Sequence, residues 1–288
     1  YVAQDKGFYK DEGLDVTIKP GGPDIVPAQV LAGGGADVMV DWMPSALAAR
    51  EKGLPLVNIA QPFKSSGMML TCRKDMGVNS TSDLKGKTLG VWFYGNEYPF
   101  LSWMSRLGLK TDGSSDGVTV LKQGWGVEPL TEGQAACVST MSYNEYWVVR
   151  DAGYSPEQLT VFKYQTEGAA TLEDGLYVHE KNLSDSAFKD KMVRFVRASM
   201  KGWKHAEANP KEAAMIILEN DDAGVQTEKH QVRMMGEIAK LTAGSNGSLD
   251  PADYERTVKV LMSGASDPVI TKKPSGAWTH EITDAALK

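Results

Sequence analysis

The sequence predicts an α/β fold built from two similar units and a helical C-terminal tail. Short apolar runs, typical of buried strands, alternate with amphipathic stretches typical of helices, and only short turns separate them. The same alternation starts again after Val91, and from Ser186 onward helical spacing dominates. Alternation of this kind favours a parallel sheet covered by helices.

The first unit opens with an amphipathic helix over residues 1–12, for which Gly13 provides the C-cap. Three glycines at residues 33–35 make a tight turn from a helix into a buried strand. An alanine-rich helix that ends at Lys52 follows that strand. The other elements predicted here are a helix at residues 25–32 and strands at residues 14–18, 37–40, 56–61 and 68–72.

The second unit begins with a capped turn at residues 79–87, which leads into a strand ending at Val91. We then expect helices at residues 98–107, 127–132 and 144–152 and strands at residues 118–121, 135–140, 161–162 and 176–178. The tail is predicted as helices at residues 186–208, 210–219, 227–241 and 251–263. Apolar residues from Met192 to Trp203 recur at helical spacing and mark a buried face.

Two units followed by a tail suggest two lobes, with a chain that leaves the first lobe, builds the second and returns. No stretch rich in Pro, Ser or Gly and no charged connector separates them. We expect residues 1–75 and 178–288 to form lobe 1 and residues 76–177 to form lobe 2.

Composition excludes two broad classes of function. The chain has 288 residues, which suggests about two domains, and a formal net charge of −6. Nucleic-acid binding needs a concentrated basic stripe, and the most basic stretch, residues 271–274, is a short surface loop. No run approaches the ~20 apolar residues of a membrane span. The sequence lacks an initiator Met and starts in mid-pattern, so it gives no information about targeting.

Residues that support metal, redox or nucleophilic chemistry are sparse. Cys72 and Cys137 lie in apolar strand-like runs, and two cysteines are too few for a disulfide framework, so we expect buried free thiols. The four histidines are scattered without metal-ligand spacing. Residues 86–88 resemble the end of a phosphate loop, but position 81 is Thr where its first Gly belongs. There is no Gly-x-Ser-x-Gly elbow. We therefore expect no catalytic residue, metal or cofactor.

Aromatic and polar side chains follow two of the predicted strands, at residues 92–98 and 143–147. Ligands bind at the carboxyl ends of strands in open α/β sheets. Flat rings beside Asn and Glu suit a planar, nitrogen-rich molecule better than a sugar or a metal ion. The candidate ligand-binding residues are Trp42, Gln61, Phe63, Phe93, Tyr94, Asn96, Glu97, Trp125, Tyr143, Asn144, Glu145, Asp174 and Tyr177.

Structural roles compete with binding at several of these positions. Trp42 could cover the edge of a core, and Asn96 could cap a helix with Glu97 solvated in its first turn. Trp125 lies between two glycines in a predicted loop, where it could be a ring at the mouth of a cleft. Asp174 and Tyr177 fall where the chain recrosses to lobe 1.

The opening segment YVAQDKGFYKDEGLDV resembles periplasmic solute-binding proteins of ABC importers, in the branch of thiamine-pyrimidine-precursor binding proteins and hydroxymethylpyrimidine synthases. The segments LAGGGADVMVDW, SDLKGKTLGVW and GQAACVSTMSYNEYW match the same branch in order and spacing over roughly the first two-thirds of the chain. The resemblance implies a two-lobed, type II periplasmic-binding fold that closes on its ligand by hinge motion. It also implies that an N-terminal strand of the family precedes Tyr1.

The first functional hypothesis is a receptor, expected to be a periplasmic or lipid-anchored monomer, that delivers a heterocycle to a membrane permease. Trp42, Tyr94 and Tyr143 would clamp the ring, with Asn96, Glu97 and Glu145 at its edge. A thiamine-type aminopyrimidine is the first choice of ligand and a riboflavin-like ring the second.

Two alternatives use the same fold. In a hydroxymethylpyrimidine synthase the resemblance implies a pyridoxal-phosphate lysine, a donor histidine and a cysteine-rich motif, and this chain has no cysteine cluster. An oxyanion receptor for sulfonate, nitrate or taurine would need Arg or bare amides in the cleft. The second-lobe arginines, Arg106 and Arg150, lie well down predicted helices.

Overall fold

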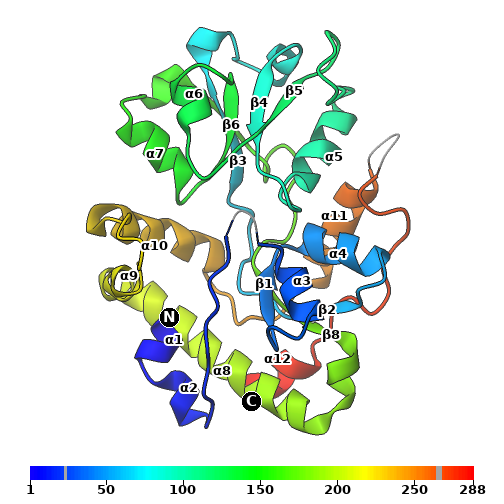
Figure 1. Ribbon diagram of the computed structural model, residues 1–288, viewed down its shortest axis with the longest axis vertical. Coiled ribbons are helices and arrows are strands. Elements are labelled where there is room, and N and C mark those ends of the chain that lie inside the picture. The colour runs from blue at the N-terminus through cyan, green and yellow to red at the C-terminus, as the bar shows by residue number, and fades with distance from the viewer. Residues whose placement is uncertain (23–24, 264–267) are drawn as a thin grey trace.

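In the computed structural model the described residues, 1–22, 25–263 and 268–288, form two lobes, each around its own sheet (Figure 1). Lobe 1 contains a three-stranded sheet of order β1-β8-β2, and lobe 2 a five-stranded sheet of order β5-β4-β6-β3-β7. The strands of lobe 1 are β1 (Met39–Asp41), β2 (Leu56–Ala60) and β8 (Gly175–His179). Those of lobe 2 are β3 (Met68–Arg73), β4 (Thr88–Val91), β5 (Thr119–Lys122), β6 (Cys137–Met141) and β7 (Leu159–Lys163).

Strand pairing corrects the predicted parallel sheet and the predicted lobe boundaries. β4 runs parallel to β5 and β6, but β3 is antiparallel to β6 and β7, and β8 is antiparallel to β1 and β2. The chain therefore crosses between lobes before β3 and again before β8, not after residues 75 and 177. The crossing strands reverse direction relative to their neighbours, and apolar runs in the sequence do not reveal that reversal.

Helices cover both sheets. In lobe 2, α5 (Tyr98–Arg106), α6 (Glu128–Thr131) and α7 (Glu145–Asp151) flank the larger sheet (Figure 1). The helices of lobe 1 are α1 (Val2–Asp5), α2 (Phe8–Asp11), α3 (Pro27–Ala32), α4 (Met43–Glu51), α8 (Ser186–Ala208), α9 (Pro210–Glu219), α10 (Glu228–Thr242), α11 (Pro251–Met262) and α12 (Glu281–Ala286). Short 3₁₀ turns occupy Lys74–Met76, Thr81–Leu84, Pro156–Gln158 and Glu180–Ser184. No helix in the described part of the chain is both long and apolar enough to cross a membrane.

The N-terminal segment differs from its prediction in two ways. Gly7 adopts φ 74°, so the predicted helix over residues 1–12 is split into α1 and α2. The strand predicted at residues 14–18 is wrong, because this segment is assigned to no strand and its alternating apolar residues pack elsewhere. Leu14 and Val16 contact the cluster formed by Ala3, Tyr9 and Ala198.

The two cysteines form a disulfide inside lobe 2, so the expectation of free thiols is wrong. Cys72 on β3 lies directly opposite Cys137 on β6, and their Cα atoms are 3.9 Å apart. Both residues are fully buried. The bridge ties the crossing strand β3 to the strand that leads into the turn before α7.

Candidate functional site

Two crossing segments connect the lobes, and Glu173 links them. Its buried carboxylate accepts hydrogen bonds from the backbone N–H groups of Gly67, at 2.8 Å, and Met68, at 3.3 Å, and from the Ser66 hydroxyl. Gln61, fully buried, donates from its side chain to the carbonyl oxygens of Glu173 and Phe63. The predicted ligand residue Gln61 therefore holds the hinge. Glu173 is not among the residues predicted from the sequence. The feature that could have identified it is its position in the second segment that crosses between the lobes.

The hinge brings two further carboxyl groups beside Trp42. The Trp42 side chain donates to the Asp174 carboxylate, and the Trp42 backbone N–H donates to Asp41 Oδ1 at 2.7 Å. Ser45 donates its hydroxyl to Asp41 Oδ2 at 3.0 Å. Burial raises the pKa of Asp41 and of Asp174 to about 6 and that of Glu173 to about 8. Asp174 also has φ 42°, an uncommon backbone conformation for a residue other than glycine.

Tyr143 lies next to this acidic group, from the other lobe. Its ring centroid is 6.5 Å from that of Phe63, which is buried and in turn packs edge-on against Trp203 at 5.6 Å. Burial, and then the charges of Asp174, Glu173 and Glu145, raise the pKa of Tyr143 well above its ordinary value. Its hydroxyl therefore stays protonated and can act as a hydrogen-bond donor.

Glu145, at the start of α7, is buried and its carboxylate is already oriented by the protein. Oε2 accepts from the Met141 backbone N–H at 2.9 Å, and Oε1 accepts from Asn144 Nδ2 at 2.7 Å. Burial raises the pKa of Glu145, although these hydrogen bonds oppose the shift. The other end of the Asn144 amide bonds to His230 Nε2 at 2.7 Å, so both ends of Asn144 are engaged with protein groups. His230 was not predicted, because it is far away in the sequence.

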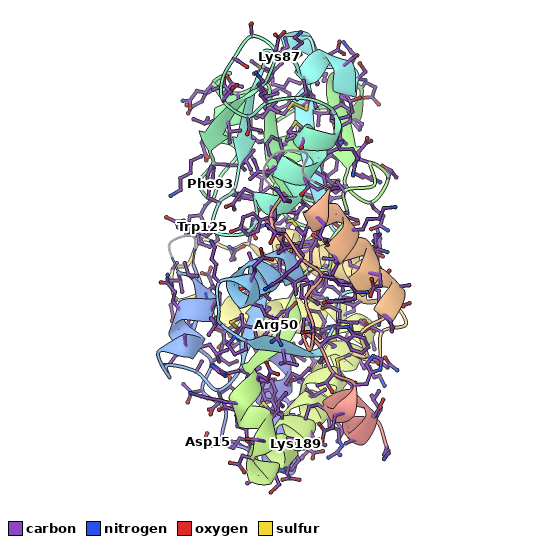
Figure 2. All side chains as sticks on the ribbon, turned by 90° about the vertical axis from the view of Figure 1, so that its right-hand side faces the viewer. Asp15, Arg50, Lys87, Phe93, Trp125 and Lys189 are labelled. Carbon is purple, nitrogen blue, oxygen red and sulfur yellow. A yellow bond between two sulfur atoms is a disulfide. The ribbon has the colours of Figure 1, made fainter. Side chains whose placement is uncertain are left out.

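Three predicted aromatic residues form an exposed rim on lobe 2. Phe93 is 37% exposed, Tyr94 46% and Trp125 72%. Figure 2 shows Phe93 and Trp125 on the same side of the molecule, close to where the lobes meet. Lys122 lies 4.6 Å from the Tyr94 ring centroid and donates to its hydroxyl at 3.1 Å. Tyr94 is thus at the surface, whereas Tyr143 is beside the buried hinge carboxylates.

The remaining predicted residues have structural contacts. Glu97 accepts from the Gly95 backbone N–H at 2.7 Å and shapes the turn before α5, where Asn96 is partly buried. Tyr177 is buried in the core of lobe 1, and its hydroxyl contacts Met43 Sδ at 3.6 Å. The structure therefore brings together Trp42, Asp174, Phe63, Tyr143 and Glu145 with Asn144 and Gln61, whereas the rim residues Phe93, Tyr94 and Trp125 are exposed.

The described residues contain no group of three or more His, Cys, Asp or Glu side chains arranged to hold a metal ion. The buried carboxylates are held by hydrogen bonds from indole, hydroxyl and amide donors. Such a site offers rings and hydrogen-bond acceptors, and it suits a ligand that supplies donors of its own.

Comparison with known proteins identifies the family. The profile described as NMT1/THI5 like matches residues 1–213. The chain belongs to this family. The formylaminopyrimidine-binding protein of Halalkalibacterium halodurans is 25% identical over 271 residues, which cover 91% of this chain and 79% of the relative. The riboflavin-binding protein RibY of Chloroflexus aurantiacus is 26% identical over 227 residues, 76% of this chain and 61% of the relative.

Solved structures share the fold of this NMT1/THI5-like chain. A protein from Bordetella bronchiseptica RB50 aligns with a TM-score of 0.74 and 22% identity over 99% of this chain and 91% of its own. The putative periplasmic sulfonate-binding protein SsuA of Methylobacillus flagellatus aligns with a TM-score of 0.65 and 15% identity, over 97% of this chain and 84% of its own. The fold is that of two-lobed periplasmic binding proteins, as expected from the sequence.

Proposed function

We propose that this protein is the substrate-binding component of an ABC importer and captures a planar, amine-bearing N-heterocycle between its lobes. The observation that carries the proposal is the grouping of Trp42 and Tyr143 with the carboxyl groups of Asp41, Asp174 and Glu145. Rings from the two lobes offer flat faces, each worth ~1–3 kcal/mol when a base-like ring stacks on it. Carboxylates accept hydrogen bonds from an exocyclic amine or a ring N–H.

The acidic character of the site separates this ligand class from oxyanions. Sulfonate has several acceptor oxygens and no donors, and it requires cationic or amide donors around it. Near Trp42 the hinge presents Asp41, Glu173 and Asp174 instead, and burial, followed by the neighbouring acidic groups, raises the pKa of Glu173 and Asp174, so this region disfavours a further negative charge. The likeness to sulfonate-binding proteins therefore supports the fold and not their ligand.

Among heterocycles, a thiamine-type aminopyrimidine is our first choice because its amine matches the carboxylates. The formylaminopyrimidine-binding relative supports this choice, and the riboflavin-binding relative supports a larger ring as the second. The exposed rim of Phe93, Tyr94 and Trp125 would contact such a larger ring where it extends beyond the buried carboxylates.

A receptor fits these residues better than a synthase does. In the family's enzymes the resemblance implies a cysteine-rich motif, whereas both cysteines of this chain are joined in a buried disulfide. The ring nitrogen Nε2 of His230, beside the site, is already bonded to Asn144. We propose that the protein has no catalytic activity of its own.

Such a receptor is located outside the cytoplasm and delivers its ligand to a membrane permease. Disulfides persist in oxidising compartments, and the Cys72–Cys137 bridge agrees with a periplasmic or lipid-anchored location. The periplasmic binding proteins of the same fold support that location. We expect a monomer, because each lobe closes on the other lobe of the same chain.

The decisive experiment is calorimetric titration with 4-amino-5-hydroxymethyl-2-methylpyrimidine, riboflavin and an alkanesulfonate. We expect the aminopyrimidine to bind most tightly and the sulfonate not at all. Glu145→Gln should weaken the aminopyrimidine at least tenfold, because an amide in place of a carboxylate accepts fewer and weaker hydrogen bonds. Tight sulfonate binding, or a Glu145→Gln variant with unchanged affinity, would contradict the proposal.

A further inference from the structure

Side chains of α10 in lobe 1 reach α7 in lobe 2. His230 Nε2 bonds to Asn144 Oδ1 at 2.7 Å. One helical turn further on, Arg233 pairs with Asp151, with N–O distances of 3.0 and 3.5 Å. Its guanidinium also lies 4.7 Å from the ring centroid of Trp147. Two helices from different lobes are thus joined through the tips of their side chains.

An open pocket lies beside these contacts. Its volume is about 180 Å³, and it is lined by Met69, Ser142, Tyr146, Trp147, Val161 and Lys163 of lobe 2 and by Glu237 of α10. Because the two helices meet here through side-chain tips beside an open pocket, they can separate without disrupting the core of either lobe.

The Glu145 carboxylate only accepts hydrogen bonds, so it sets which way the Asn144 amide faces, and the His230 contact restrains the amide in that orientation. The amide oxygen faces α10 and its NH₂ faces Glu145 Oε1, at 2.7 Å. Burial, and then the charge of Arg233, lower the pKa of His230, so its ring is neutral at neutral pH. Because the amide oxygen faces α10, the neutral ring matches it as the tautomer with its proton on Nε2, and this hydrogen bond resists rotation of the Asn144 side chain.

We propose that His230 is a positioning residue that couples lobe closure to the orientation of Glu145. When the lobes close, His230 fixes the Asn144 amide, and Asn144 then holds the Glu145 carboxylate in place. When they open, Asn144 is released and Glu145 loses a donor. This inference rests on the proposed function, in which Glu145 accepts a hydrogen bond from the ligand.

The first test requires no ligand. In protein labelled with ¹³C at glutamate side chains, the titration of Glu145 is followed by NMR in wild type, His230→Ala and His230→Gln. We expect a higher Glu145 pKa in His230→Ala, because the Asn144 donor that stabilises the charged carboxylate becomes free to rotate. His230→Gln retains an amide donor and should restore part of the wild-type value. An unchanged Glu145 pKa in His230→Ala would overturn the proposal.

The second test measures affinity for 4-amino-5-hydroxymethyl-2-methylpyrimidine and riboflavin. His230→Ala should bind roughly tenfold more weakly than wild type, the size of effect expected for one hydrogen bond to a charged group. The matched control is His205→Ala, since His205 makes a similar 2.7 Å contact, to Glu212, away from the site. Equal losses in both variants would overturn the positioning role. If wild type binds neither heterocycle, the proposed function fails, and the NMR titration still decides the role of His230.

Discussion

The Glu173 carboxylate accepts a hydrogen bond from the Gly67 backbone N–H at 2.8 Å, and this contact joins the two segments that cross between the lobes. Gly67 precedes β3 and Glu173 precedes β8, so each residue stands where the chain enters a different sheet. Since any hinge motion turns about these segments, Glu173 holds the axis of lobe closure together. A buried carboxyl in that place makes the hinge sensitive to pH.

We predict that the stability of the protein falls as pH rises from 6 to 8 because of Glu173. Burial raises its pKa from 4.5 to about 8. The stabilisation from the protonated carboxyl is complete below pH 4.5 and is lost as pH rises through the folded pKa. With a pKa of 4.5 in the unfolded chain and about 8 in the folded protein, the free energy of unfolding falls by on the order of 2 kcal/mol between pH 6 and pH 8. Asp41 and Asp174 have a pKa of about 6, so their contribution to the pH dependence of stability falls at lower pH than that of Glu173.

Urea unfolding at several pH values checks this prediction. Glu173→Gln should lose most of the slope between pH 6 and pH 8, because the amide does not ionise. Glu219→Gln is the matched control, since Glu219 is exposed at the end of α9. The same slope in Glu173→Gln and wild type would assign the pH dependence to other groups.

The disulfide should contribute strongly to stability. Cys72 and Cys137 are 65 residues apart in the sequence, and closing a loop of that length in the unfolded chain is worth ~4 kcal/mol in the chain-entropy model. The double variant Cys72→Ala/Cys137→Ala should therefore unfold at lower urea concentration than wild type. Dithiothreitol should destabilise wild type and leave the variant unchanged. Two free thiols in denatured, unreduced wild type would show that the bridge does not form.

The order and type of most elements follow from hydrophobic periodicity, whereas the pairings that build the site do not. The strands predicted at residues 56–61 and 68–72 form nearly as expected, because their apolar runs are local signals. The bridge between Cys72 and Cys137 depends on the register of β3 against β6, which periodicity does not specify. Likewise, His230 bonds to Asn144, which lies 86 residues earlier in the sequence, and local periodicity does not indicate such a contact.

The predicted sandwich of Trp42, Tyr94 and Tyr143 illustrates the same limit. All three follow predicted strands, and the sequence predicts that they clamp one flat ring. In the structure Trp42 and Tyr143 lie beside the hinge carboxylates, while Lys122 holds Tyr94 at the surface. How deeply a side chain lies in the cleft depends on the backbone turn that follows its strand. Tyr94 has a left-handed backbone conformation, with φ 65°, which the residue type alone does not indicate.

Trp42 should contribute to affinity through both its ring and its N–H group. Trp42→Phe keeps a flat ring but removes the donor to Asp174, so we expect a modest loss of aminopyrimidine affinity and a higher Asp174 pKa. Trp42→Leu also removes the aromatic face and should weaken binding by a further ~1–3 kcal/mol. Calorimetric titration measures the first effect, and NMR titration of Asp174 the second. Equal affinities for all three proteins would exclude Trp42 from the site.

Gly95→Ala should hold the lobes apart. Gly95 lies in lobe 2 with φ 110°, and a Cβ atom there would come within 2.6 Å of Ser45 Cβ in lobe 1. Such a contact is far inside the van der Waals limit, and backbone of lobe 1 lies just behind it, at 3.3 Å. The closed arrangement should therefore be penalised more than the fold of either lobe.

Gly153→Ala isolates this steric effect from backbone strain. Gly153 has a similar φ of 101°, but a Cβ there would meet no atom within 4 Å. Both variants should lose comparable stability from the left-handed backbone, on the order of 1–2 kcal/mol. In small-angle X-ray scattering, only Gly95→Ala should show a larger radius of gyration than wild type, together with weaker aminopyrimidine binding. If Gly95→Ala and Gly153→Ala scatter alike, closure does not bring Gly95 against Ser45, and the lobes meet in some other way.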